Sequence, residues 1–376
     1  MPMRAISSLA MSAPLTRDHV GQRRLRHVVG FGPARNAAER QLEDAGLVLP
    51  FSQRAEWLQA VGYQNSALFI VDCDERAQAA IGIGIGHSRS LPGHLIYRVD
   101  RVGASVSGEA DADLLEGIRD ATFADRRCIR LQVEVFEREP ELRERLASTL
   151  QGLGFVRAPH TASYLRTPCL DLGPSEEALF AKVAASARRN VRAPAKRGFQ
   201  LRTVEDPAYI NRLEELIEEV FSRTGGTTRE FPWAAILRAS RASPNRSRVI
   251  GLFAPNDNGP SGLLAFAWGC VNGNYVTYDA GASTRNHDLG NMPLAYAPLW
   301  DLIAWAKRIG ATWFDFGGVS TTTAAPTDDP LGGISDFKRF FCERIVDVGE
   351  DWILEPRPIR AMIARTFSAA VERVRR

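Results

Sequence analysis

Residues 332–341 read GGISDFKRFF and place two glycines, several aromatic residues and a lysine in one short segment. The lysine, Lys338, is one of four lysines among the 47 lysines and arginines of the chain. A chain that uses arginine so freely favours lysine where a compact ammonium group is needed. Lys338 could donate to a phosphate, a carboxylate or a developing oxyanion, with Phe337 as an apolar wall. The alternative is a solvated lysine on a helix whose phenylalanines only pack.

The segment before this lysine ends a predicted strand in glycine. Residues 311–318 read ATWFDFGG, so the strand passes Asp315 and runs into Gly317 and Gly318. Glycines at that point let the chain turn tightly and let a ligand approach the backbone. The polar loop that follows is longer than a simple turn, as functional loops often are. We therefore predict that Asp315, Gly317 and Gly318 bind a substrate beside Lys338.

A second group of candidates lies between residues 178 and 204, where seven cations occur without any Asp or Glu. Arg188, Arg192 and Lys196 fall at i, i+4 and i+8, on one face of a predicted helix. Like charges at this spacing repel one another, and an anionic partner relieves that cost. A diphosphate or a nucleic-acid backbone fits this role, and a solvated basic face is the alternative.

Two further candidates are placed by the loops around them. Arg229 lies in a Gly- and Thr-rich loop between predicted helices, and Tyr278 lies near the end of a predicted strand. The segment RNHDLGNM (285–292) precedes a predicted helix, as a phosphate-binding loop does. It lacks the R/Q-x-x-G-x-G/A run expected of a coenzyme A pyrophosphate loop. That departure argues against ordinary acetyl-CoA use.

Composition limits the class of protein. The 376 residues are 45% hydrophobic and 24% charged with a net charge of +3, which is typical of a soluble globular chain and not of a polyelectrolyte binder. The five cysteines form no CxxC pair and have no nearby His at zinc-ligand spacing, so we expect reduced thiols and no metal. No apolar stretch is long enough for a signal peptide or a membrane span. We expect a cytoplasmic protein.

The order of predicted elements repeats in the two halves of the chain. Each half has three strands, a helix, a strand and a second helix, over residues 66–154 and again over 247–341. This is the layout of the acetyltransferase (GNAT) fold, so we predict an α/β (α+β) protein with two tandem GNAT-like domains, each a mixed sheet flanked by helices. The predicted boundaries are a partly ordered N-terminal segment (1–45), a first domain (46–172), a second domain with a helical connector (173–356) and a basic C-terminal helix (357–376).

Six segments occur in the order found in the FemABX family, and from about residue 50 to 355 the sequence resembles that family. They are EWLQAVG, RRNVRAPAKRG, YDAGAS, LWDLIAWAKRIG, WFDFGG and GGISDFKRFF. FemABX proteins are non-ribosomal peptidyltransferases that attach amino acids to peptidoglycan precursors. The resemblance implies two GNAT-like domains, aminoacyl-tRNA as co-substrate with no other cofactor, and an amine acceptor on a UDP-linked or lipid-linked muropeptide.

The resemblance also implies roles for individual residues. Phe337 and Lys338 match the pair that lines the transfer site, where the lysine binds the tRNA end or stabilises the transition state. Arg229 and Tyr278 fall at acceptor-site positions. The family's phosphate-binding lysine in the first domain has no clear equivalent, and Arg54 is the nearest candidate. The stretch 202–209 leaves no room for the coiled-coil insertion of some members.

Three functions remain open from the sequence. The leading hypothesis is an aminoacyltransferase that forms an amide between an amino acid from tRNA and a peptidoglycan stem peptide or a small-molecule amine. The second is an N-acyltransferase that uses acyl-CoA or an acyl carrier. The third is a non-catalytic protein that binds nucleic acid or an anionic glycopeptide. The basic C-terminal helix also allows the protein to contact the inner face of an anionic membrane. The oligomeric state is not predicted.

Overall fold

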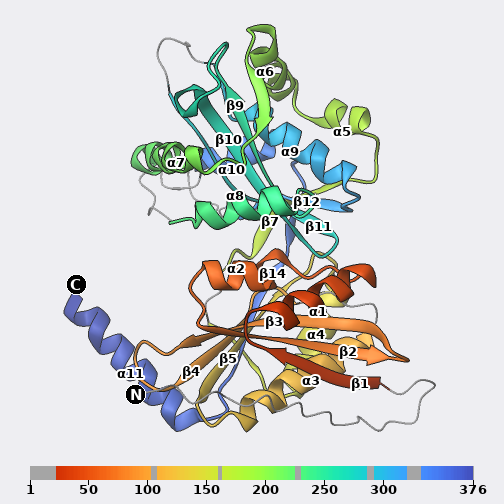
Figure 1. Cartoon of the computed structure of the whole chain (residues 1–376), viewed down its shortest axis with the longest axis vertical. Coiled ribbons are helices and arrows are strands. Elements are labelled where there is room, and N and C mark those ends of the chain that lie inside the picture. The colour runs from red at the N-terminus through yellow and green to blue at the C-terminus, as the bar shows by residue number, and fades with distance from the viewer. Residues whose placement is uncertain are drawn as a thin grey trace. The chain divides into compact units, whose positions relative to one another are not determined.

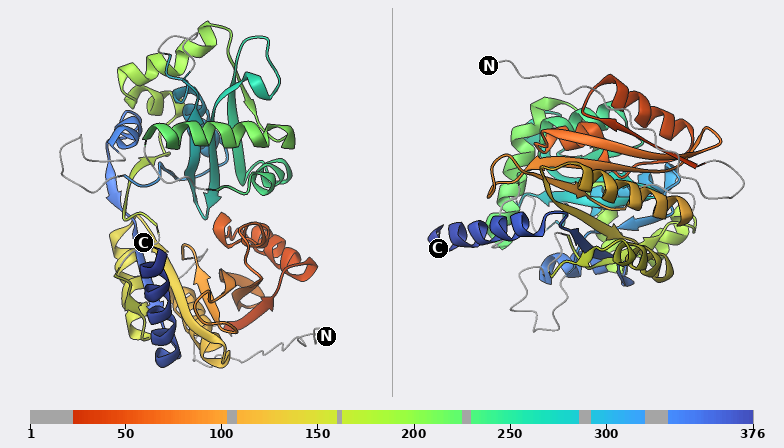
Figure 2. Two further views of the ribbon diagram at one scale, coloured as in Figure 1. Left: turned by 90° about the vertical axis from the view of Figure 1, so that its left-hand side faces the viewer. Right: turned by 90° about the horizontal axis from the view of Figure 1, so that it is seen from below.

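The computed structural model describes residues 23–102, 108–159, 163–224, 230–285, 292–319 and 332–375. These residues form two compact units (Figures 1 and 2). The first unit comprises Met1–Ala162 together with Val348–Arg376, and the second comprises Ser163–Asp347. Each unit contains one seven-stranded mixed sheet. The predicted tandem α/β architecture is confirmed.

The first sheet has the strand order β1-β2-β3-β4-β5-β14-β6. Its strands are β1 (Arg23–Val29), β2 (Asn65–Cys73), β3 (Arg76–His87), β4 (Leu95–Val99), β5 (Cys128–Phe136), β14 (Gly349–Leu354) and β6 (Val156–Arg157). Only β4 and β5 pair in parallel; the other neighbours are antiparallel. Its helices are α1 (Pro33–Asp44), α2 (Ala55–Ala60), α3 (Gly108–Ala124), α4 (Pro140–Gly152) and α11 (Pro358–Arg375), with a 3-10 turn at Phe51–Gln53.

Helices cover both faces of the first sheet. Phe69 and Val71 of β2 belong to the larger core, which also contains residues of α3 and α4. Leu68 and Ile70 point to the opposite face, because side chains alternate along a strand, and they pack with α1. Apolar residues on both sides explain the almost unbroken apolar run of β2.

The second sheet has the order β13-β7-β12-β11-β10-β9-β8. Its strands are β13 (Ile345–Asp347), β7 (Arg166–Asp171), β12 (Trp313–Asp315), β11 (Tyr275–Ser283), β10 (Leu263–Asn272), β9 (Ser247–Phe253) and β8 (Gln200–Thr203). Again one central pair, β11 and β12, is parallel. Its helices are α5 (Glu176–Lys182), α6 (Ala185–Lys196), α7 (Ile210–Thr224), α8 (Trp233–Ala242), α9 (Tyr296–Arg308) and α10 (Gly332–Arg339), with 3-10 turns at Pro207–Tyr209 and Pro260–Gly262.

The two sheets correspond strand by strand, but each contains one strand from beyond the predicted boundary. β7 follows β6 in the chain and yet pairs with β12 and β13 in the second sheet. β14 follows β13 and yet pairs with β5 and β6 in the first. The predicted boundaries at 172 and 356, which put β7 in the first domain and β14 in the second, are therefore corrected. Residues 155–172, which the sequence alone would suggest as a hairpin closing the first domain, are instead two strands, β6 and β7, of different sheets.

The N-terminal segment is also more structured than predicted. Residues 23–29 form the edge strand β1, which pairs with β2 from Arg23↔Cys73 to Val29↔Ala67. Its sequence, RRLRHVV, is rich in cations, which on edge strands discourage pairing with another chain, while Leu25 and Val28 pack against the two cores. Between β8 and α7 the chain has room only for a short 3-10 turn, so the second unit has no coiled-coil insertion there. None of the described helices is long and apolar enough to cross a membrane.

Candidate active site

The candidate site lies where the two parallel strands of the second unit separate. β11 and β12 pair over only three positions, from Tyr275↔Trp313 to Thr277↔Asp315. β11 continues to Ser283, whereas the other strand ends and turns at Gly317 and Gly318. In open α/β sheets ligands bind beyond the carboxyl ends of parallel strands. Residues 278–283 of β11 therefore extend beyond the end of its pairing with β12, beside the glycine-rich turn.

A β-bulge changes the direction of β11 at this point. Gly269 of β10 faces Tyr278 and Trp268 faces Ala280, so Asp279 is the extra residue. Bulges re-aim side chains next to active sites. The Tyr278 ring lies over Gly281, where an added Cβ would be 2.0 Å from the hydroxyl. Burial raises the pKa of Tyr278, so its hydroxyl stays protonated at neutral pH.

Asp315 organises the turn from inside. It is fully buried, and Thr167 donates to Oδ1 at 2.6 Å while the Gly317 N–H donates to the same oxygen at 2.8 Å. Tyr164 and Thr277 donate to Oδ2. Four protein donors thus occupy the carboxylate that we predicted to bind substrate. Asp315 is better described as the residue that fixes the positions of β7, β11 and the glycine turn.

Lys338 reaches this turn from α10. Its Nζ donates to the Gly318 carbonyl at 2.7 Å, and the residue is only 7% exposed. An added Cβ on Gly317, which has φ +75°, would lie 3.5 Å from Nζ and 3.2 Å from the Tyr278 carbonyl. Burial lowers the pKa of Lys338 from 10.5 to about 8, and the Asp315 carboxylate partly opposes this. The ammonium form is therefore retained at neutral pH but can lose its proton just above it.

Aromatic rings form one wall beside the lysine. Phe337 meets Tyr296 of α9 edge to face at 4.9 Å between ring centroids and meets Phe341 at 5.6 Å. Phe341 continues the stack to Phe316, which follows β12, at 6.1 Å. Such offset and edge-to-face pairs fix ring positions beyond what burial alone does. The Phe337 wall is thus part of a continuous aromatic layer.

The cations of α6 divide into structural and exposed ones. Arg188 donates to the carbonyls of Ala181 and Val183 at 2.6 and 2.7 Å, so it closes the end of α5 and is not a free anion ligand. Arg192 is exposed and lies over the Phe180 ring at 4.8 Å; Lys196 is also exposed.

The start of α6 is joined to the lysine helix. The Ala184 N–H donates to the Phe340 carbonyl at 3.0 Å. Asn190 of α6 hydrogen-bonds to the Tyr296 side chain, which contacts Phe337. The exposed cations of α6 and the Lys338 site therefore belong to one connected part of the second unit.

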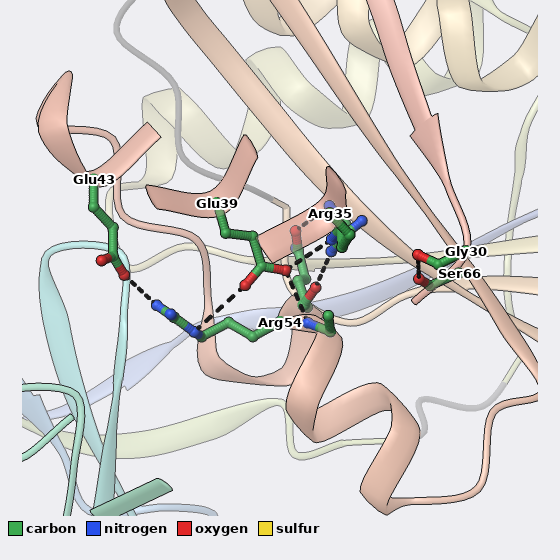
Figure 3. A network of polar contacts seen from close by, with 9 residues as sticks. Gly30, Arg35, Glu39, Glu43, Arg54 and Ser66 are labelled. Carbon is green, nitrogen blue, oxygen red and sulfur yellow. Dashed lines mark hydrogen bonds and ion pairs between the residues drawn. The ribbon is translucent and has the colours of Figure 1, made fainter. Parts of the chain in front are cut away.

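Arg54 lies in a different environment, in the first unit (Figure 3). It pairs with Glu43 and lies 3.9 Å from Glu39, which also binds the buried Arg35 at 2.7 Å. The two carboxylates already balance its charge, so a phosphate would have to displace them. The phosphate role of Arg54 stays a prediction. Arg229, predicted as an acceptor-site residue, lies outside the described residues.

Three of the residues that build this site have no recognisable signal in the sequence. Tyr164 and Thr167 lie about 150 positions before Asp315 and reach it only because β7 joins the second sheet. Thr277 faces Asp315 by strand register and accepts a hydrogen bond from Asn272 at 3.0 Å. Among the described residues no group of three or more His, Cys, Asp or Glu could hold a metal ion.

Comparison with known proteins supports the fold. The sequence matches no protein-family model and no curated protein. Among solved structures, FemX is similar with a TM-score of 0.68 and 15% identity, covering 89% of this chain and 99% of that one. A tandem GNAT protein from the clavulanic acid biosynthesis pathway (TM-score 0.49, 15% identity, 89% and 99% covered) is more distant. So is the C-terminal domain of a putative lysylphosphatidylglycerol synthetase from Agrobacterium fabrum (TM-score 0.48, 13% identity, 90% and 97% covered). The chain has a tandem GNAT-like fold of the kind seen in FemX.

Proposed function

We propose that the protein is an acyltransferase that moves an amino acid from the ester of an aminoacyl-tRNA to an acceptor amine. The observation that carries this proposal is the buried Lys338 ammonium at the glycine turn where β11 and β12 separate. Lysine has three N–H donors, and only one is used by the Gly318 carbonyl. The remaining donors can bind an oxygen that becomes negatively charged.

The chemistry requires little from the protein beyond positioning and charge stabilisation. The acceptor nitrogen attacks the ester carbonyl carbon, a C–N bond forms, and the carbonyl oxygen becomes an oxyanion beside Lys338. The ester C–O bond then breaks. The proton lost by the amine nitrogen balances the one gained by the ribose oxygen, which leaves as a hydroxyl group. Because an ester is converted to an amide, the step is downhill and consumes no nucleotide. Holding both reactants in place supplies most of the remaining rate enhancement.

The choice of donor rests on the exposed cations of α6. Arg192 and Lys196 belong to a stretch of the sequence without acidic residues, and the helix that carries them is joined to α10. An RNA phosphate backbone would neutralise them while its aminoacylated end lies near Lys338. The departure of residues 285–292 from the pyrophosphate-loop pattern makes acyl-CoA the less favoured donor. We propose a peptidoglycan stem peptide as the acceptor, with a small-molecule amine as the alternative.

The test supplies purified protein with charged tRNAs, each amino acid radiolabelled in turn, and UDP-muropeptide or a small-molecule extract. Label should appear in an amide, and Lys338→Ala should reduce turnover at least tenfold. Lys307→Ala is the matched control, since Lys307 also donates to a backbone carbonyl of the second unit, that of Leu172 at 2.9 Å. Equal losses in both variants, or consumption of acyl-CoA in place of charged tRNA, would contradict the proposal.

A further inference from the structure

The C-terminal helix α11 presents two different faces. Ala361 and Ala364 are buried. Arg357, just before the helix, donates to the carbonyls of Thr122 and Cys128 at 3.1 and 3.2 Å and so fixes its start on the first unit. From there α11 extends outward toward the C-terminus (Figure 1). The opposite face is exposed as far as Phe367, the last helix residue whose side chain is described.

That exposed face carries four large apolar side chains, with the smaller Thr366 between them. Ile359, Met362, Ile363 and Phe367 are 70%, 54%, 38% and 57% exposed. Successive helical residues are about 100° apart, so these four lie within an arc of roughly 140° whose centre is opposite Ala361 and Ala364. Isolated exposed apolar residues are normal on protein surfaces, but a row of large ones on one helix marks an interaction site.

Cations border this apolar stripe. By the same helical geometry, Arg360 lies at one edge and Arg365 toward the other. Residues 357–376 contain six arginines and one glutamate. Glu355 pairs with Arg365 but is shared with Arg130, at 2.9 Å, so it balances only one of the two. Among the described residues the stripe therefore has an arginine on each side, and the sequence that follows adds further cations.

We propose that α11 lies flat on an anionic lipid bilayer and inserts Ile359, Met362, Ile363 and Phe367 at the headgroup boundary. A helix with a narrow apolar face and flanking arginines binds membranes in this way, through apolar burial and attraction to acidic headgroups. A second copy of the chain fits less well, because pairing two such helices would bring their arginines together without matching carboxylates. RNA would satisfy the arginines but leave the four apolar side chains without a role.

The inference is independent of the transfer reaction and is tested without it. Full-length protein is sedimented with vesicles of phosphatidylcholine alone and with vesicles that also contain phosphatidylglycerol. We expect binding to the anionic vesicles, weakened roughly tenfold in Phe367→Glu by loss of apolar insertion. Arg360→Gln should weaken it about fivefold. Val156→Glu makes the same charge change at a 64% exposed apolar residue of β6 and should leave binding unchanged.

The outcomes separate the alternatives. Loss of binding in Phe367→Glu but not in Val156→Glu supports the membrane contact, provided that both variants unfold in urea like the parent protein. Absence of binding to anionic vesicles, or equal binding by Phe367→Glu, overturns it. Sedimentation velocity tests whether a second copy of the chain covers this face instead. If the protein does not bind vesicles but forms a dimer that Phe367→Glu dissociates, the partner of the face is a second copy and not a membrane.

Discussion

Replacement of Lys338 by methionine should change the free energy of unfolding in a pH-dependent way and should independently reduce turnover. The folded protein lowers the pKa of Lys338 from 10.5 to about 8, and burial is the main cause. At pH 7 the lysine is protonated in both folded and unfolded chains, and the folded state bears a cost of about 3 kcal/mol for the buried charge. As pH rises above 8 the folded-state lysine becomes neutral while the unfolded one still holds its proton. That cost is therefore relieved between about pH 8 and 10.5.

Lys338→Met removes this cost and also leaves the Gly318 carbonyl without its partner, which opposes the gain by about 1–3 kcal/mol at every pH. The difference in unfolding free energy between variant and parent should therefore favour the variant by about 2.5 kcal/mol more at pH 7 than at pH 10. Urea titrations of both proteins at the two pH values measure it, since other ionisable groups cancel.

The same titrations contain the test of the reasoning. Lys307→Met gives the effect of losing a lysine–carbonyl hydrogen bond in the same unit. If the Lys338→Met difference does not change with pH, Lys338 is not held as a costly buried cation. The ammonium charge would then cost little in the folded protein, and a requirement of the transfer reaction would not be needed to explain it. Turnover by Lys338→Met should be abolished in either case if the ammonium group stabilises the oxyanion.

Three further variants, one of them a double substitution, probe the parts around the lysine. Asp315→Asn keeps one acceptor oxygen but turns an amide NH₂ toward protein donors, so it should lower the unfolding free energy by about 3 kcal/mol, measured in urea. It should also reduce kcat more than KM, and an unchanged kcat would contradict its positioning role. Gly317→Ala should lower the free energy of unfolding by about 1–2 kcal/mol, because residue 317 has φ +75° and the added Cβ would crowd the Tyr278 carbonyl. A stability equal to that of the parent protein would argue against this backbone conformation. Arg192→Ala combined with Lys196→Ala should weaken tRNA binding and reduce the slope of log K against log[salt] by about 1.5, and an unchanged slope would place the RNA elsewhere.

The sequence predicted the positions of helices and strands better than it predicted which strands pair with one another. The strand expected after the first helix of the first half is observed as β5 (Cys128–Phe136), because its apolar positions alternate and charged residues flank it. The pairing of β7 with β12 could not be predicted, since a strand's sequence records its burial and not which sheet provides it. The same limit explains the candidate site. Lys338 and the glycines share one local pattern, whereas Thr167 contributes through a contact 148 positions away.

The two units share a strand order, yet their central parallel pairs are built differently, and this explains why the candidate chemistry is in the second. In the first unit β4 and β5 remain paired over five positions, up to Val99↔Val133, and β5 continues to Phe136 with β14 alongside it. In the second unit the pairing stops after three positions and glycines follow. The second unit therefore combines an early end of its parallel pair with a glycine turn and a buried lysine. In a duplicated fold the two copies can differ in this way, because function depends on the local site and not on the shared strand order.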